Sequence, residues 1–151
     1  MAKKIKILFL CTGNSCRSQM AEGWARHLQG EVIEPQSAGI EARGLDPRAV
    51  IVMAEAGIDI SHQKSKTVAQ LPTRDFDYVV TVCDNARESC PIFPGKARMV
   101  HVGFEDPPKL ATGARTEEEV LAHYRRVRDE IKAFVLTLPR SLPADKRGPL
   151  E

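Results

Sequence analysis

The sequence lacks any long hydrophobic run, and this absence excludes a membrane-spanning protein. No apolar stretch in the 151 residues approaches the ~20 that a transmembrane helix needs. The basic N-terminus precedes an apolar run too short for a secretory signal peptide. The net charge of +2 is small, so it does not indicate a nucleic-acid partner or a membrane surface. We therefore expect a cytoplasmic protein with neither kind of partner.

Cysteine is scarce, with four residues in the chain: Cys11, Cys16, Cys83 and Cys90. Permanent structural disulfides are unexpected in a reducing cytoplasm. Structural zinc sites favour cysteine pairs separated by roughly two to four residues, twice over. Here the gaps are four and six residues, and the first pair flanks an arginine. We predict no metal site and interpret the cysteines as reactive thiols.

The length and the apolar content of 42% suit one domain with a real core, which we place at residues 1–140. Three prolines follow residue 138, so residues 141–151 are predicted to form a flexible C-terminal tail. No internal repeat is present, and we expect a monomer.

Short apolar runs alternate with amphipathic stretches along the chain. Runs rich in β-branched residues predict strands at 5–10, 31–37, 77–82 and 98–102. Helical spacing predicts helices at 19–30, 46–57 and 116–138, with Ser18, Asp46 and Thr116 as their N-caps. This alternation predicts an α/β fold: a three-layer sandwich with a four-stranded parallel sheet flanked by helices.

The segment between the first strand and the first helix carries the strongest functional signal. A tight loop there directs its backbone N–H groups, and the positive end of the helix dipole, at one point. Gly13 and Asn14 tolerate the unusual backbone angles that such a loop needs. The sequence therefore predicts an oxyanion site formed by Thr12, Gly13, Asn14, Ser15, Cys16, Arg17 and Ser18.

Cys11, at the start of this loop, is the predicted nucleophile. A helix N-terminus and the nearby Arg17 both favour its thiolate, and Ser18 can add a hydrogen bond. The Arg17 guanidinium can hold two oxygens of a tetrahedral anion. Asp106, held by two following prolines, is the predicted general acid for a leaving oxygen, with Glu105 as the less favoured neighbour.

The Cys11–Ser18 loop together with Asp106-Pro107 resembles the low-molecular-weight protein tyrosine phosphatases. Cys83 and Cys90 are not explained by a phosphatase, and they resemble the thioredoxin-coupled arsenate reductases, which share that fold. The resemblance extends to about residue 138. Further matching text is Ser18-Gln19-Met20-Ala21-Glu22-Gly23, Ser37-Ala38-Gly39 and Gly57-Ile58-Asp59-Ile60-Ser61.

The resemblance implies a three-thiol mechanism. Cys11 attacks arsenate while Asp106 protonates the departing oxygen, and Cys83 then attacks Cys11 as arsenite leaves. Cys90 attacks Cys83, and thioredoxin, the external reductant, reduces the resulting disulfide. No bound cofactor is implied, and phosphate or sulfate would mimic the substrate. Cys16 has no required redox role.

Some members of that family bind potassium, and three of the ligand positions match Asn14, Glu22 and Ser37. The fourth, an aspartate in those members, falls at Lys66. A lysine supplies positive charge and does not ligate a cation. We therefore predict that no potassium binds, and that Lys66 lies near Asn14 and Glu22 in its place.

Two other functions stay open. A phosphatase acting on phosphotyrosine would favour aromatic residues beside Asp106, where only Phe104 is aromatic. A non-enzymatic regulator could use the thiols to bind arsenite, but arsenite needs only thiolates and not an anion-binding loop.

Overall fold

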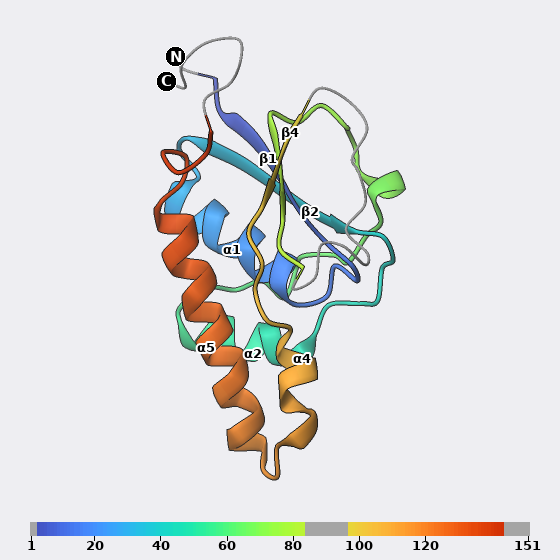
Figure 1. Ribbon diagram of the computed structural model, residues 1–151, viewed down its shortest axis with the longest axis vertical. Helices are drawn as coiled ribbons and strands as arrows, with labels where there is room; N and C mark the ends of the chain where they lie inside the picture. The colour runs from blue at the N-terminus through green and yellow to red at the C-terminus, as the bar shows by residue number, and fades with distance from the viewer. Residues whose placement is uncertain (1–2, 84–96, 144–151) are drawn as a thin grey trace.

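The computed structural model describes residues 3–83 and 97–143. Four parallel strands form one sheet in the order β2-β1-β3-β4. The sheet lies beside helices, as Figure 1 shows, which confirms the predicted α/β fold with a four-stranded parallel sheet. The strands are β1 (Ile5–Cys11), β2 (Ile33–Gly39), β3 (Tyr78–Thr81) and β4 (Arg98–His101).

Strand β1 is buried on both faces from residue 7 onward, as the apolar residues 7–10 predict, and Lys6 is its one half-buried position. Ile7 and Phe9 belong to the larger core, which the sheet shares with the helices. Leu8 and Leu10 point to the opposite face and pack with Phe76 in a smaller cluster. Burial of each such side chain contributes about 1.5–3 kcal/mol to folding, so β1 anchors both layers.

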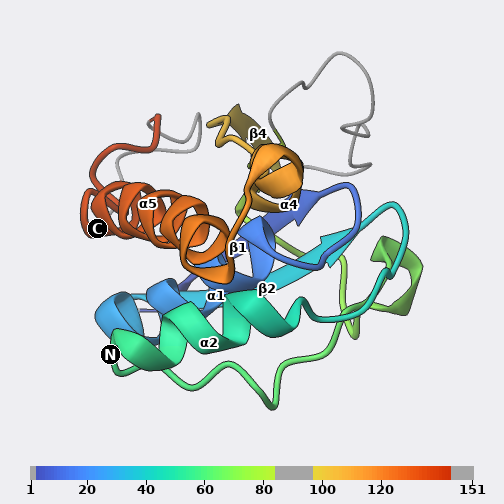
Figure 2. The ribbon, with the colours of Figure 1, turned by 90° about the horizontal axis from the view of Figure 1, so that it is seen from below.

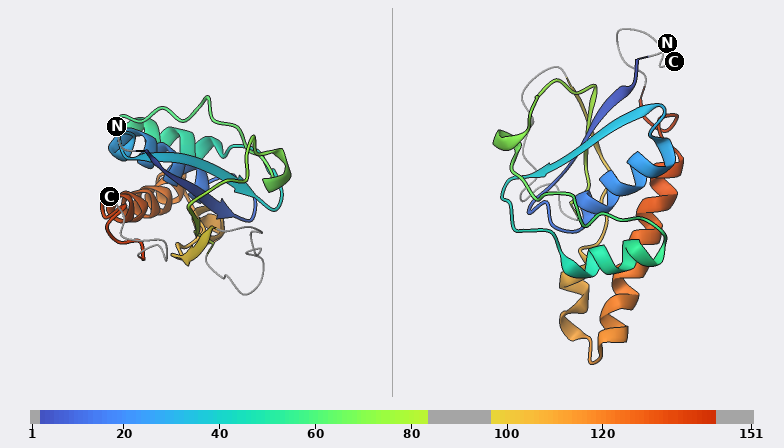
Figure 3. Two further views of the ribbon diagram at one scale, coloured as in Figure 1. Left: turned by 90° about the horizontal axis from the view of Figure 1, so that it is seen from above. Right: turned by 180° about the vertical axis from the view of Figure 1, so that it is seen from behind.

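Three helices cover one face of the sheet: α1 (Arg17–Gln29), α2 (Pro47–Glu55) and α5 (Glu117–Leu136). They gather on the same side in Figure 2. The short 3-10 turn Val68–Gln70 lies away from them and helps to cover the smaller cluster (Figure 3). None of the described helices is long and apolar enough to cross a membrane.

Trp24 joins α1 to α5. The ring is buried, and its Nε1 donates a hydrogen bond of 3.2 Å to the carbonyl of Arg128. The Lys132 ammonium lies 5.2 Å from the ring centroid, within the range of a cation–π contact. The helix that follows the Cys11 loop is therefore fixed against the longest helix of the fold.

Two of the three predicted N-caps are confirmed. Asp46 Oδ1 accepts a hydrogen bond from the Arg48 amide, and Thr116 accepts one from the Glu119 amide. The prediction for Ser18 is wrong, because α1 begins at Arg17 with Cys16 as its N-cap. The Ser18 hydroxyl contacts other partners inside the first turn, which are described below.

The segment after β4 contains a helix that was not predicted from the sequence. The two prolines that follow Asp106 open α4 (Pro107–Leu110), with Asp106 at its N-cap position. Proline suits a first helical turn, because its missing N–H would have no partner there. Asp106 is thereby held at the start of a helix.

The predicted tail begins too early. Leu142 is buried, and the Tyr78 hydroxyl donates a 2.7 Å hydrogen bond to the carbonyl of Pro143. The chain therefore stays packed against β3 through residue 143. The rest of the predicted tail, residues 144–151, lies outside the described residues.

Candidate active site

Cys11 is the last residue of β1, an inner strand that lies between the edge strand β2 and the inner strand β3. The carboxyl ends of parallel strands meet at this edge, where open α/β sheets bind ligands. A pocket of about 240 Å³ opens there. Its described lining comprises Cys11, Thr12, Gly13, Ser15, Cys16, Arg17, Arg43, Asp106 and Pro108. The structure thus brings the predicted nucleophile, guanidinium and acid to one cavity.

Asn14 holds the loop from behind and does not line the pocket. It is fully buried and has a φ of 48°, in the left-handed region that asparagine tolerates better than most residues. Its Nδ2 donates to Ser18 Oγ at 2.8 Å. Its Oδ1 accepts from Gln19 Nε2 at 3.0 Å and from the Lys66 amide at 2.8 Å. One side chain therefore ties the loop to α1 and to the 64–67 segment.

Two glutamines, Gln19 and Gln63, extend this arrangement, and no sequence pattern indicated a role for either. Gln19 Nε2 also donates to the carbonyl oxygens of Asn14 and Lys64. Gln63 Nε2 donates to Gln19 Oε1 at 2.8 Å and to the Gln19 carbonyl at 3.0 Å. We call Asn14, Ser18, Gln19 and Gln63 the loop-support network. Among the described residues, no buried side-chain nitrogen or oxygen lacks a hydrogen-bond partner.

Ser18 links this network to the nucleophile. Its Oγ lies 3.1 Å from Cys11 Sγ, and both residues are buried. Because Oγ accepts a hydrogen bond from Asn14 Nδ2, its own proton is free to point at the sulfur. The geometry therefore allows the predicted hydrogen bond from the Ser18 hydroxyl to the Cys11 sulfur.

Arg17 and Asp106 face each other across the pocket. Arg17 Nη1 donates to the carbonyl of Phe104 at 3.0 Å, and its Nε lies 3.6 Å from Asp106 Oδ1. The Arg17 side chain is 10% exposed and that of Asp106 is 33% exposed. The guanidinium is thus fixed against the acid loop, while the carboxyl group keeps access to solvent and to a ligand.

Cys16 is a free, buried thiol in the same loop. Burial raises the pKa of the Cys16 thiol well above its ordinary value, and the carboxylates of Asp46 and Asp106 raise it further. The thiol therefore stays protonated at neutral pH and is a poor nucleophile. This fits the prediction that Cys16 has no required redox role, which remains a prediction.

Asp46 connects the loop to two helices. Its amide donates to the Ser15 carbonyl at 3.0 Å, and its Oδ2 accepts a 2.7 Å hydrogen bond from the Tyr124 hydroxyl on α5. Burial raises the pKa of Tyr124, and the hydrogen bond to Asp46 raises it further. The phenol is therefore a stable donor behind the loop, in a position that no sequence pattern indicated.

Cys83 lies two residues beyond β3, at the same edge of the sheet. The amide of the preceding Val82 donates to the Leu10 carbonyl, which extends the β1–β3 pairing to the level of Cys11. Cys83 is buried and disulfide-bonded, whereas Cys11 and Cys16 are free thiols. Cys90, the third predicted thiol, lies outside the described residues.

The prediction for Lys66 is only partly right. Its amide contacts Asn14, but its ammonium donates to the Lys64 carbonyl at 3.3 Å instead of facing Glu22. Glu22 is paired with Arg26 at 2.8 Å and accepts a 2.5 Å hydrogen bond from Ser37. Arg26 follows Glu22 by one helical turn, so the positive charge comes from α1 itself.

A family model matches this chain over residues 6–147, and its description is low molecular weight phosphotyrosine protein phosphatase. Two curated relatives named arsenate reductase cover most of the chain. The protein of Halalkalibacterium halodurans is 54% identical over 137 residues, which are 91% of this chain and 96% of that protein. The protein of Bacillus subtilis is 52% identical over 131 residues, which are 87% of this chain and 91% of that protein.

Solved structures give the same fold. An arsenate reductase in the phosphate binding state superposes with a TM-score of 0.74 at 33% identity, covering 92% of this chain and 99% of that chain. A low molecular weight protein tyrosine phosphatase from T. tengcongensis superposes with a TM-score of 0.71 at 28% identity. It covers 92% of this chain and 100% of that chain.

Proposed function

This chain belongs to the low molecular weight phosphotyrosine protein phosphatase family, and from that premise we propose that it reduces arsenate to arsenite. The relatives of about half-identical sequence that are named arsenate reductases support this choice of reaction. The observation that carries it in this molecule is the cysteine pair at one sheet edge. Cys11 ends β1, and Cys83 follows the neighbouring β3 at the same edge of the sheet.

The first step forms a bond between sulfur and arsenic. The Cys11 thiolate attacks arsenate, which the loop amides and Arg17 hold in the pocket, and one arsenate oxygen leaves. Asp106 gives its proton to that oxygen, so that it departs as water once a second proton is taken from the arsenate or from solvent. The Ser18 hydroxyl, 3.1 Å from the sulfur, stabilises the attacking thiolate.

The second step supplies the electrons. Cys83 attacks the Cys11 sulfur, the sulfur–arsenic bond breaks, and its electron pair goes to arsenic, which leaves as arsenite. Cys90 then attacks Cys83, which frees Cys11 and leaves a disulfide between Cys83 and Cys90. A dithiol supplies the two electrons of the reduction.

Thioredoxin is the proposed reductant of that last disulfide, and no bound cofactor is needed. The proposal places the protein in the cytoplasm as a monomer, where thioredoxin keeps thiols reduced. Phosphate or sulfate should occupy the same pocket as competitors, because both are tetrahedral oxyanions.

Aryl phosphate hydrolysis is the second candidate, and the family model favours it. None of the described residues that line the pocket is aromatic. Phe104 is buried and packs against Phe134, with 6.1 Å between ring centroids, so its ring is not available to a phenyl group. This lining favours a small inorganic anion over phosphotyrosine.

Arsenite released without external reductant tests the relay. Fully reduced parent should release about one equivalent per chain, since one disulfide is the product. Cys90→Ser should release about the same amount, because Cys11 and Cys83 suffice for one turnover. Cys83→Ser should release almost none.

Continuous turnover is then followed as NADPH loss with thioredoxin and its reductase. Only the parent should turn over. If either serine variant turns over like the parent, the relay is wrong. If the parent is inert with arsenate but cleaves an aryl phosphate, the phosphatase candidate holds.

A further inference from the structure

Arg43 lies at the mouth of the pocket, in the connection between β2 and α2. It lines the same cavity as Cys11, Arg17 and Asp106. Its amide donates a 3.0 Å hydrogen bond to the carbonyl of Gly13, so the backbone of this connection is attached to the anion-binding loop. The pocket therefore has a second guanidinium besides that of Arg17.

The side chain of Arg43 lies against the loop at a position that only glycine leaves open. A Cβ on Gly13 would come within 2.7 Å of Arg43 Cδ and 3.1 Å of its Cγ. The φ of Gly13 is not in the left-handed region. Glycine therefore suits this position because it leaves room for the Arg43 side chain, and not because of its backbone freedom. At the other end of the stem, Nε donates to Glu41 Oε2 at 2.8 Å.

The guanidinium groups of Arg43 and Arg17 differ in their hydrogen-bond partners and in their exposure. Arg17 is engaged by the Phe104 carbonyl and by Asp106, and its side chain is 10% exposed. The Arg43 side chain is 59% exposed, and among the described residues no hydrogen bond engages its Nη1 or Nη2. A free guanidinium fork at a pocket mouth matches two oxygens of an oxyanion.

We propose that Arg43 determines specificity by drawing anionic reactants to Cys11 in preference to neutral ones. The proposal rests on the oxyanion-binding role of the pocket and not on the redox relay. Because Arg43 is exposed and its Nε is paired with Glu41, its attraction acts through solvent and is screened by salt. It therefore raises the rate at which anions enter and leaves the chemical step unchanged.

Alkylation of Cys11 by two reagents of the same size tests this. Iodoacetate is anionic and iodoacetamide is neutral, and the modified Cys11 peptide is quantified by mass spectrometry. The ratio of the two rates isolates charge, because a general disturbance of the loop slows both. Circular dichroism checks that each variant is folded.

In Arg43→Gln the ratio of iodoacetate to iodoacetamide rates should fall about threefold to tenfold at low ionic strength, since one charge is lost from the mouth. Arg43→Lys should keep most of the parent ratio. In 0.5 M salt the attraction between exposed charges is strongly screened. The rate ratios of the parent and of Arg43→Gln should then agree to within about a factor of two.

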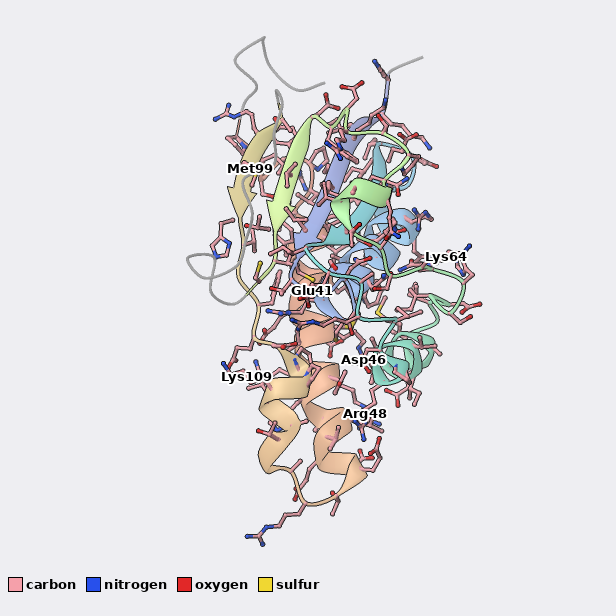
Figure 4. The ribbon with its side chains drawn as sticks, turned by 90° about the vertical axis from the view of Figure 1, so that its right-hand side faces the viewer. Glu41, Asp46, Arg48, Lys64, Met99 and Lys109 are labelled. Atoms are coloured by element: carbon pink, nitrogen blue, oxygen red, sulfur yellow. The ribbon has the colours of Figure 1, made fainter. Side chains whose placement is uncertain are left out.

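Arg48→Gln is the matched control. It removes the same charge from α2, where Arg48 is paired with Glu117 on α5 outside the pocket lining. In Figure 4, Glu41 lies at the ends of the strands, and Arg48 lies farther along, toward the tips of the helices. The ratio should be unchanged in this variant.

An unchanged ratio in Arg43→Gln, or an equal fall in Arg48→Gln, overturns the proposal. Neither result bears on arsenite release, which is measured separately, so the reductase proposal would stand. Conversely, suppose that Arg43→Gln lowers the ratio of iodoacetate to iodoacetamide rates but the parent releases no arsenite. That result supports the role of Arg43 and rules out the reductase proposal. With active protein, Arg43→Gln should raise the KM for arsenate about threefold to tenfold and leave kcat unchanged.

Discussion

The two sides of the Cys11–Ser18 loop are built from different chemistry. Behind it, the loop-support network uses neutral amides and a hydroxyl, and Asn14, Ser18 and Gln19 have no exposed surface. In front of it, Arg43 and Asp106 carry ionisable groups and are partly exposed. Neutral groups behind the loop therefore fix its conformation, and ionisable groups in front of it face the ligand.

The reason lies in the cost of burial. A buried neutral group costs little once it is hydrogen-bonded, whereas a buried charge also needs an opposite charge and further hydrogen bonds to offset its lost hydration. Neutral hydrogen bonds can thus fix the loop without competing with an incoming anion. In front, Arg43 remains available to that anion and Asp106 to its leaving oxygen, so the loss of either side chain should affect reactivity and leave stability nearly unchanged.

The sharpest test of the front is Asp106→Asn. We expect the rate of the sulfur–arsenic bond-forming step to fall by about 10²–10⁴, since a general acid is lost. The free energy of unfolding should change by less than about 0.5 kcal/mol, because the Asp106 side chain makes no capping hydrogen bond to α4 and is partly exposed. Arsenite release in a single turnover and urea unfolding measure the two effects.

A large loss of stability in Asp106→Asn would contradict the claim that residues in front of the loop affect reactivity and not stability. An unchanged rate would remove Asp106 from the mechanism and make the neighbouring Glu105 the next candidate. Glu105 is paired with Arg126 at 3.0 Å, which holds it away from this role in the parent.

The test of the back is Asn14→Ala. Removing this side chain takes away the donor to Ser18 and leaves the part-buried Lys66 amide without its acceptor, while Gln19 Nε2 keeps the carbonyls of Asn14 and Lys64. We expect the free energy of unfolding to fall by about 2–4 kcal/mol, measured by urea unfolding. Alkylation of Cys11 should also slow, since Ser18 loses the bond that orients its hydroxyl.

Asn14→Gly separates two causes of that loss. Glycine adopts the φ of 48° freely, so it should recover about 1 kcal/mol relative to alanine, and the remainder measures the hydrogen bonds. If both variants were as stable as the parent, the network would not hold the loop, and the contrast between its two sides would fail.

Tyr124→Phe has the smallest expected effect, because Tyr124 acts on the loop only through Asp46. Loss of one hydrogen bond should lower the free energy of unfolding by about 1 kcal/mol at neutral pH. The raised pKa of Tyr124 adds a pH dependence. The unfolded chain loses this proton at about pH 10, before the folded one does, so stability falls as pH rises above that value.

In Tyr124→Phe this part of the alkaline fall should be absent, and stability should depend less on pH between about 9 and 11. Urea unfolding at a series of pH values, followed by circular dichroism, compares the variant with the parent. An identical slope in both proteins would show that Tyr124 ionises normally in the folded state.

Local patterns were enough to predict the four strands, the helices α1, α2 and α5, and three residues of the pocket, but not α4 or Arg43. Cys11 and the loop residues lie next to one another in the sequence, directly after β1. Asp106-Pro107 follows β4, another strand of the same parallel sheet. The parallel sheet itself brings such segments together. Residue type and position in the sheet thus sufficed for Cys11, Arg17 and Asp106.

The back of the site was not predictable in the same way. Gln63 lies 44 residues from Gln19, and the Lys66 amide lies 52 residues from Asn14. A glutamine in a polar loop has no spacing that reveals such a partner. The Ser18 cap failed for the same reason: its hydroxyl satisfies Cys11 and Asn14, and these tertiary contacts outweigh the local preference for capping.

Trp24, fixed between α1 and α5, is the single tryptophan of the chain. Its fluorescence is therefore the signal of one known position, with an indole that is 2% exposed and hydrogen-bonded. The helix that carries it begins at the anion-binding loop, and no second indole dilutes a change in its emission. The molecule thus contains its own optical probe of the junction between the loop and the helical layer, without any added label.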